Sequence, residues 1–222
     1  MSERVNSRAA AAAARRKQLL EVAEDLFLEH GYAKTSVSRI VKTAGVAQGT
    51  FYLYFSSKEA ILLELRRGVL RRLRRAFKEA SAAPPPAALP ADARLAAGFA
   101  AVAEEVVRNI PLLRQFRQAE TAVQTEQVVL EGRESMAAPI ASLIAEGVVD
   151  GVFGVDSVPI AAHAVLSLFS DLVYTSAAYG QPASTDELVP AASRMLLRAL
   201  GVAPARIDAL VPSHQRPFPE TP

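Results

Sequence analysis

Side chains able to make specific contacts are concentrated in one short stretch of the sequence, TSVSRIVKTAGVAQGTFYLYFSSKEAI at residues 35–61. Within roughly two helical turns, this stretch brings together an amide, a glycine, a hydroxyl and two phenols: Gln48, Gly49, Thr50, Tyr52 and Tyr54. A helix this short gains little stability from its own propensity and depends on packing. A polar and aromatic set on its free face therefore predicts a partner that covers that face.

Catalytic and metal chemistry are not indicated by the rest of the chain. Cysteine is absent and His30, His163 and His214 lie far apart, so the sequence predicts neither a disulfide framework nor a metal site, and no cofactor. Ser167, His163 and Asp171 fall on one predicted helix, where they cannot form the geometry of a nucleophile, a base and an orienting acid. A strand-loop-helix phosphate site is also missing, because there are no convincing strands. We therefore predict that the protein is not an enzyme.

Charge is divided unevenly along the chain. Residues 1–78 contain 16 of the 25 Lys and Arg and 7 of the 23 Asp and Glu, a net charge of +9, and the remaining residues carry −7. A basic first part joined to an acidic second part predicts that the first part binds a polyanion. Charge alone leaves nucleic acid and an anionic membrane surface open. Arg8, Arg15 and Arg16 are expected to form a solvated entry segment, with contact to an adjacent DNA groove as the alternative.

Hydrophobic periodicity predicts four helices in the basic part. The first has apolar residues at the i, i+3, i+4, i+7 spacing and is closed by Gly31, and the second is stopped by Gly45. The fourth is long and presents an apolar stripe from Leu62 to Phe77. We expect the first helix to end near His30, Thr35 or Ser36 to cap the second, the third to run from about Gln48 to Phe55, and a Ser56/Glu59 capping box to open the fourth.

A proline cluster, AAPPPAALPAD, cannot continue a helix and marks a predicted boundary near residue 82. Beyond it the segments again have helical periodicity: 92–109, 111–122, 125–149, 158–179 and 185–200, with Pro139 expected to kink the third. The sequence therefore predicts an all-α fold of about nine helices. Its expected parts are a flexible basic segment (1–14), a helix-turn-helix head with the long fourth helix (15–81), a helical body (82–201) and a Pro-rich, mostly disordered tail (202–222).

Two short helices joined by a tight turn, AGVA at 44–47, and packed on a longer first helix have the arrangement of a helix-turn-helix unit. In such a unit the second short helix enters the DNA major groove with its N-terminus first. Gln48, Gly49 and Thr50 would then meet base edges. This arrangement favours double-stranded DNA as the polyanion, although Tyr52 and its neighbours as ordinary half-buried helix residues are the alternative.

The segment GYAKTSVSRIVKTAGVAQGTFYLYFSSKEAIL resembles the DNA-binding head of the TetR family of bacterial transcriptional repressors. The likeness covers about residues 15–63 and includes the family's Thr-hydrophobic-Tyr-x-x-Phe pattern at residues 50–55. It implies operator DNA as a partner, with phosphate contacts from Thr35, Ser36, Tyr52, Tyr54 and Lys58 and base contacts from Gln48, Gly49 and Thr50. Ala47 departs from the pattern, because relatives often carry a Ser that caps the recognition helix.

The segment 158–179 is long enough to span a bilayer, but His163, Asp171 and several hydroxyls are spread along it. A partner subunit is therefore predicted to cover its apolar faces, which gives a homodimer through 158–179 and 185–200 and no membrane partner. The first residues also lack the apolar core of a secretory signal, so we expect a cytoplasmic protein.

A helical body fused to a DNA reader is predicted to bind a small, largely apolar effector that releases the protein from DNA. Helical phase alone gives candidate lining residues, and ordinary core is the alternative for the apolar ones. These candidates are Phe99, Phe116, Glu120, Met136, His163, Phe169 and Tyr174. A different alternative is a helical homodimeric ligand-binding protein with a degenerate head that does not bind DNA, which the missing cap at Ala47 keeps open.

Overall fold

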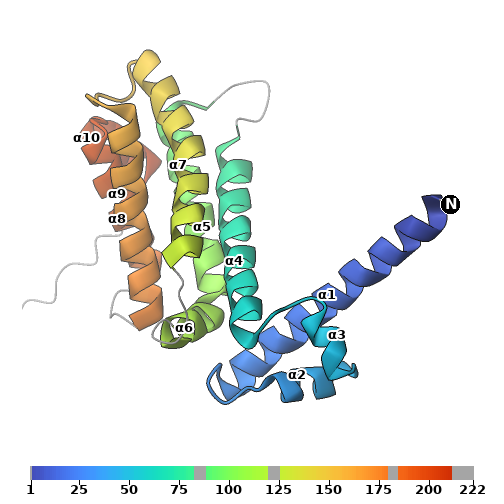
Figure 1. Ribbon diagram of the computed structural model, residues 1–222. Helices are drawn as coiled ribbons and strands as arrows, with labels where there is room; N and C mark the ends of the chain where they lie inside the picture. Colours follow the sequence, from blue (N-terminus) through green and yellow to red (C-terminus); the bar gives the residue numbers. More distant parts are fainter. Residues whose placement is uncertain (1, 83–88, 120–125, 180–184, 212–222) are drawn as a thin grey trace, which may run out of the picture. The chain divides into compact units, whose positions relative to one another are not determined.

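The computed structural model describes residues 2–82, 89–119, 126–179 and 185–211. Every regular element among these residues is an α-helix, which confirms the predicted all-α class (Figure 1). The ten described helices are α1 (Ser2–His30), α2 (Val37–Ala44), α3 (Gln48–Tyr52), α4 (Lys58–Ser81), α5 (Ala91–Arg108), α6 (Ile110–Ala119), α7 (Glu126–Val149), α8 (Val158–Tyr179), α9 (Thr185–Ala199) and α10 (Pro204–Leu210). No helix in the described ranges is long and apolar enough to cross a membrane.

The chain folds into two compact units. Unit 1 comprises Met1–Val69 and Pro111–Val129, and unit 2 comprises Leu70–Ile110 and Leu130–Pro222. Helices α4 and α7 are therefore divided between the two units, and the first residue of α6, Ile110, belongs to unit 2. This division differs from the predicted limits 15–81 and 82–201, because α6 contacts the N-terminal part of the chain, as Gln115 does with Tyr32, and sequence order does not reveal such contacts.

Unit 1 is held together by aromatic and aliphatic side chains from α1 to α4. Leu19, Ala23 and Phe27 of α1 are fully buried, as the helical spacing predicts. The fully buried Phe51 of α3 lies 5.8 Å from Phe55, measured between ring centroids. These two rings anchor an element too short to be stable by itself.

Three sequence expectations about helix limits are wrong. Residues 2–14 are helical rather than flexible, since the alanine run has the highest helix propensity and extends a helix already formed. The cap of α4 is Ser57 and not Ser56, because the backbone N–H of Ala60 donates to Ser57 Oγ at 3.2 Å. The third helix ends at Tyr52 rather than Phe55.

Part of the predicted disordered tail is also helical. Within residues 202–222, the segment Pro204–Leu210 forms α10, and the remainder from residue 212 lies outside the described residues. Ile207 of α10 is fully buried, and Arg206 donates two hydrogen bonds to the buried carboxylate of Asp92 at 2.8 and 3.2 Å. The Arg206–Asp92 contact joins α10 to α5 over a long sequence separation, so local periodicity did not reveal it.

Unit 2 is built around α5, which packs against both α8 and α9, while α8 and α9 pack against each other. Its aromatic core joins three helices: the ring centroids of Phe77 and Phe99 are 5.6 Å apart, and those of Phe99 and Phe169 are 4.5 Å apart. A Cβ added at Gly98 would lie 2.7 Å from the Phe77 ring, so this glycine allows close packing. Pro139 lies inside α7 as expected, and the kink there stays a prediction.

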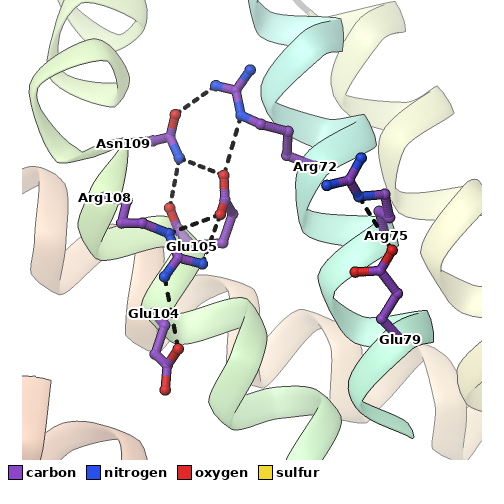
Figure 2. Close-up of polar contacts among 7 residues, drawn as sticks. All are labelled: Arg72, Arg75, Glu79, Glu104, Glu105, Arg108 and Asn109. Atoms are coloured by element: carbon purple, nitrogen blue, oxygen red, sulfur yellow. Dashed lines mark hydrogen bonds and ion pairs between the residues drawn. The ribbon is translucent and has the colours of Figure 1, made fainter. Parts of the chain in front are cut away.

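A polar cluster links α4 to the end of α5 in unit 2 (Figure 2). Arg72 donates to Glu105 Oε1 at 3.1 Å and to Asn109 Oδ1 at 2.6 Å, and Arg108 donates to Glu105 Oε2 at 2.8 Å. Burial alone would raise the pKa of Glu105, but hydrogen bonds from Arg108 and Asn109, with the charges of Arg108 and Arg72, lower this pKa below its usual value. The ionised carboxylate is therefore the form that the fold stabilises.

Glu105→Gln is expected to remove a pH-dependent part of the stability. Because the folded-state pKa of Glu105 is lowered, its contribution is present above the unfolded-state pKa of about 4.3 and is lost as the pH falls through the lowered pKa. We expect the variant to lose about 1 kcal/mol of unfolding free energy at pH 7, and less below pH 4, measured by urea denaturation. Glu79→Gln is the matched control, because the Glu79 pair with Arg75 is exposed. An equal loss in the two variants would contradict the role of Glu105.

Candidate nucleic-acid interface

The second helix of unit 1 has well-defined ends. Ser36 caps α2 by accepting a hydrogen bond at its Oγ from the backbone N–H of Arg39 at 3.2 Å, so of the two predicted caps it is Ser36 that acts. Gly45 ends the helix in the left-handed region, with φ 64° and ψ 35°, which favours glycine at this position. The chain then reverses over Val46 and Ala47 into α3, as the predicted turn requires.

The third helix has no capping side chain. Its N-cap residue is Ala47, and no side-chain hydrogen bond is made there. Packing replaces the cap, since Phe51 is fully buried against the other helices of the unit. The rest of α3 is turned outward, and Tyr52 is 53% exposed.

The three predicted base-contacting residues lie together at the start of α3. Gln48 and Gly49 are exposed and Thr50 is half-buried. A Cβ added at Gly49 would meet no other atom of the chain within 4 Å, and Gly49 is not among the glycines with positive φ. Neither internal crowding nor backbone conformation therefore requires glycine at this position. Close approach of another molecule would require it.

The predicted phosphate-contacting residues are divided by the structure into two groups. Ser36 and Tyr52 are exposed and Tyr54 is half-buried. Thr35 is only 1% exposed, and its hydroxyl lies 2.9 Å from the Gly31 carbonyl oxygen and 3.2 Å from that of Leu26. Its side chain therefore contacts the protein's own backbone rather than solvent.

Lys58 is also engaged within unit 1. Its Nζ donates to the Tyr32 carbonyl oxygen at 2.9 Å and lies 4.1 Å from the centroid of the Tyr32 ring. Burial lowers the pKa of Lys58, and the nearby Glu59 carboxylate partly opposes this effect. The ammonium group of Lys58 therefore links the start of α4 to Tyr32, which lies just after the end of α1.

Tyr32 is the structural residue that sequence analysis missed. Its hydroxyl donates to Glu59 Oε1 at 3.0 Å, and its backbone N–H donates to Gln115 Oε1 of α6 at 3.1 Å. Burial raises the pKa of Tyr32, and the hydrogen bond and charge of Glu59 raise it further. Tyr32 thus connects α1, α4 and α6 of unit 1. Only the long-range contacts reveal this role.

Three further exposed side chains near α3 were not predicted. Arg39 and Lys42 lie on the outer side of α2, where Ile40, Val41 and Ala44 face the core. Leu53, directly after α3, is 80% exposed. The signal for the two basic residues was present in the sequence, since they alternate with the apolar positions of an amphipathic helix. The surface around α3 is therefore basic as well as polar.

The predicted effector-binding residues do not form a single group. Phe99, Met136 and Phe169 are buried core residues of unit 2. Phe116 belongs to unit 1, with its ring centroid 5.8 Å from the Arg66 guanidinium carbon. All four side chains are buried core residues, and their role in lining an effector site stays a prediction.

The polar members of that set give no support to an internal site. The side chain of His163 is exposed and its Nδ1 lies 2.8 Å from the Pro159 carbonyl oxygen, so its role in an effector site stays a prediction. Glu120 lies outside the described residues, and so does the side chain of Tyr174. Among the residues that the structure describes, no group of three or more His, Cys, Asp or Glu side chains is placed to hold a metal ion.

Known proteins with similar sequences share mainly the helix-turn-helix segment. Residues 19–65 match the model of bacterial regulatory proteins of the tetR family. The fatty acid metabolism regulator protein of Bacillus subtilis (strain 168) is 50% identical over 48 residues, which are 22% of this chain and 25% of that protein. The chain thus spans only about a quarter of the length of this relative. YhgD, an uncharacterized HTH-type transcriptional regulator of the same organism, is 26% identical over 72% of this chain and 83% of its own length.

The fold of the whole chain also has solved counterparts. The fatty acid degradation regulator FadR from Bacillus halodurans superposes with a TM-score of 0.65 at 23% identity, covering 85% of this chain and 97% of that one. At this level of identity the likeness concerns the fold. The matched head, the curated regulators and the shared helical architecture agree, and all identify the tetR family of bacterial regulatory proteins as the family that this chain resembles.

Proposed function

We propose that this protein is a sequence-specific DNA-binding transcriptional regulator that reads operator DNA with α3 and acts as a repressor. The observation that carries the proposal is the start of α3, where exposed Gln48 and half-buried Thr50 flank a glycine that the fold itself does not require. In a helix-turn-helix unit this is the end of the helix that approaches base edges in the major groove.

Electrostatics support the same partner. Residues 1–78 carry a net charge of +9, and exposed Arg39 and Lys42 lie on the helix that precedes α3. Basic side chains that neutralise phosphates release counterions, and this release supplies affinity for any DNA sequence. Specificity must then come from base edges, for which the Gln48 amide is suited, since glutamine can hydrogen bond in two places to adenine.

A homodimer through α8 and α9 would supply two reading helices. The two helices pack against each other in unit 2, and each has apolar or small side chains turned outward. On α8 these include Ile160, 71% exposed, and Ala164 one turn later, while Met195 of α9 is 42% exposed. Two-fold pairing of these faces would bury them and present two copies of α3 to successive half-sites.

A small, largely apolar ligand is proposed to release the protein from DNA. Two similar proteins are named as regulators of fatty acid metabolism or degradation, which makes acyl compounds the first class to test. The effect of the ligand on unit 2 would be transmitted to unit 1 through α4, because this helix continues without a break from one unit into the other. Linkage requires that DNA weaken the ligand by the same factor as the ligand weakens DNA, so equal ligand affinities with and without DNA would refute release.

Substitutions at Gln48 and Lys42 test the proposed division between base and phosphate contacts. With a duplex selected from a random library by the wild-type protein, Gln48→Ala is expected to relax the preference at one base pair, a loss of about 1–3 kcal/mol of discrimination. Lys42→Ala should weaken all sequences alike and lower the slope of log affinity against log salt by about one unit per head. Fluorescence anisotropy over a salt series measures both effects.

Two outcomes would overturn parts of this proposal. A uniform loss on every sequence for Gln48→Ala would remove its role as a base reader. Failure of the wild-type protein to select any duplex would instead favour a ligand-binding homodimer with a degenerate head, for which the uncapped Ala47 is the motivating feature.

A further inference from the structure

The first helix extends well beyond the part of it that is buried. Helix α1 begins at Ser2, and among its residues from 7 onward, whose burial is described, the first buried one is Leu19, while residues 7–18 are exposed or half-exposed. Figure 1 shows this N-terminal part of α1 projecting past α2 and α3, with no other helix of unit 1 lying against it. We call residues 2–15 the arm. It is a continuous helical extension of the head.

Two arginines on the arm are aligned with the turn of the helix-turn-helix unit. Arg8 and Arg15 are both exposed and lie seven residues apart, which places them about two turns apart on nearly the same side of the helix. Arg15 donates to Gln18 Oε1 at 2.7 Å, and Gln18 Nε2 donates to the Ala44 carbonyl oxygen at 3.1 Å. Ala44 ends α2, directly before the turn into α3. The side of α1 that carries Arg15 therefore leads to the start of the reading element.

The neighbouring basic residues are used inside the head. Arg16 pairs with Glu64 at 3.2 Å and lies 5.1 Å from the centroid of the Phe55 ring. Lys17 pairs with Glu21 at 3.3 Å. No acidic residue occurs between Glu3 and Glu21 in the sequence, so the exposed arm has uncompensated positive charge. Its charge is complementary to a polyanion.

We propose that the arm is a second DNA-contacting element, in which Arg8 and Arg15 bind the phosphate backbone that flanks the half-site read by α3. This rests on the proposed function. Seven helical residues span about 10 Å, which equals about three base-pair steps of rise along the DNA axis. The side chains between the two arginines are six alanines, Ala9 to Ala14, so the helix is narrow enough to lie close to the backbone.

An anionic membrane is the other polyanion to which a basic helix binds, and the arm lacks the feature that membrane binding needs. Helices that lie in a membrane interface bury large apolar side chains such as Leu, Phe or Trp on the side opposite their charges. Between Arg8 and Arg15 the arm has only alanine. Its charge without an apolar face favours DNA.

The experiment compares two duplexes and three full-length variants. One duplex contains only the two half-sites selected by the wild-type protein. The other extends them by about six base pairs on each side, a length of DNA greater than the distance along α1 between Arg8 and Arg15. The variants are Arg8→Ala, Arg8→Ala/Arg15→Ala and the control Lys17→Ala, which removes an exposed charge already paired with Glu21. Alanine is the best helix former, so the arm stays helical in all three, which circular dichroism checks.

We expect the wild-type protein to bind the extended duplex about tenfold more tightly than the short one at low salt, and the double variant to lose this gain. The slope of log affinity against log salt should fall by about two units per head in the double variant and by about one in Arg8→Ala. Arg8→Ala keeps the Arg15–Gln18–Ala44 contacts, so a loss in this variant is not a rearrangement of the turn.

Three results would overturn the proposal. They are equal wild-type affinity for the two duplexes, an equal loss in Lys17→Ala, and arginine-dependent binding to phosphatidylglycerol vesicles without a length effect on DNA. If the wild-type protein binds no duplex at all, the proposed function fails as well, whereas tight binding to both duplexes without a difference refutes only the arm contact.

Discussion

Gly49→Ala is expected to make the protein more stable and a much poorer DNA binder. An added Cβ at Gly49 meets no atom of the chain within 4 Å, and the backbone there has no positive φ. Alanine should therefore raise the unfolding free energy by about 0.5–1 kcal/mol, because it restricts the unfolded chain and favours the helix. The same methyl group would occupy the space into which bases or backbone must come. We expect a loss of at least about tenfold in affinity for the selected duplex, or about 1.4 kcal/mol.

Gly154→Ala is a matched control for this substitution. Gly154 also has open space around an added Cβ and no positive φ, and it lies in unit 2. Urea denaturation should show a small stabilisation for both variants, and anisotropy should show weaker DNA binding only for Gly49→Ala. Wild-type affinity in Gly49→Ala would mean that the start of α3 does not approach DNA, and the central argument for the proposed function would be lost.

Ala164→Arg is expected to convert a homodimer into a monomer. Ala164 is exposed one turn after the 71% exposed Ile160 on α8. In a two-fold interface the same residue enters from both subunits, so the substitution places two large cations in an apolar contact. Sedimentation at micromolar concentration should show the monomer mass. Affinity for a duplex with two half-sites should fall about a hundredfold or more, since the two heads are no longer linked.

Ala97→Arg separates the dimer effect from a general effect of adding charge. Ala97 is an exposed alanine on α5, and it receives the same chemical change on a helix outside the proposed interface. We expect this variant to remain dimeric and to bind DNA normally. A wild-type protein that sediments as a monomer, or an Ala164→Arg protein that stays dimeric, would contradict the proposed interface.

Tyr32, rather than α3, is the residue of the head whose hydrogen bonds are expected to matter most for its stability. Tyr32 receives Lys58 at its carbonyl oxygen and reaches Glu59 through its hydroxyl and Gln115 through its N–H. We therefore expect substitutions at Lys58 to weaken the packing of unit 1, whether or not Lys58 also contacts phosphate.

Local sequence determined which segments are helical and where most of them end. Periodicity placed α5, α7, α8 and α9 within about one residue of their observed limits, and Gly45 ended α2 in the expected left-handed conformation. The family pattern at residues 50–55 likewise located the helix-turn-helix unit. These features depend on neighbours within one or two turns, and such neighbours are visible in the sequence itself.

The tertiary structure alone decided which polar side chains face solvent and which hold the fold together. Thr35 and Lys58 are residue types that commonly contact DNA phosphates. In the structure, however, Thr35 is hydrogen-bonded to the carbonyl oxygens of Leu26 and Gly31, and Lys58 to that of Tyr32. The link from Gln18 to Ala44, which orients the arm relative to the turn, is between residues far apart in the sequence. Helical phase restricts a side chain to one side of its helix, but the partner on that side is chosen by the packing of distant segments. For that reason the sequence located α3, the proposed reading helix, and the structure was needed to distinguish the polar side chains that hold unit 1 together from those that are exposed.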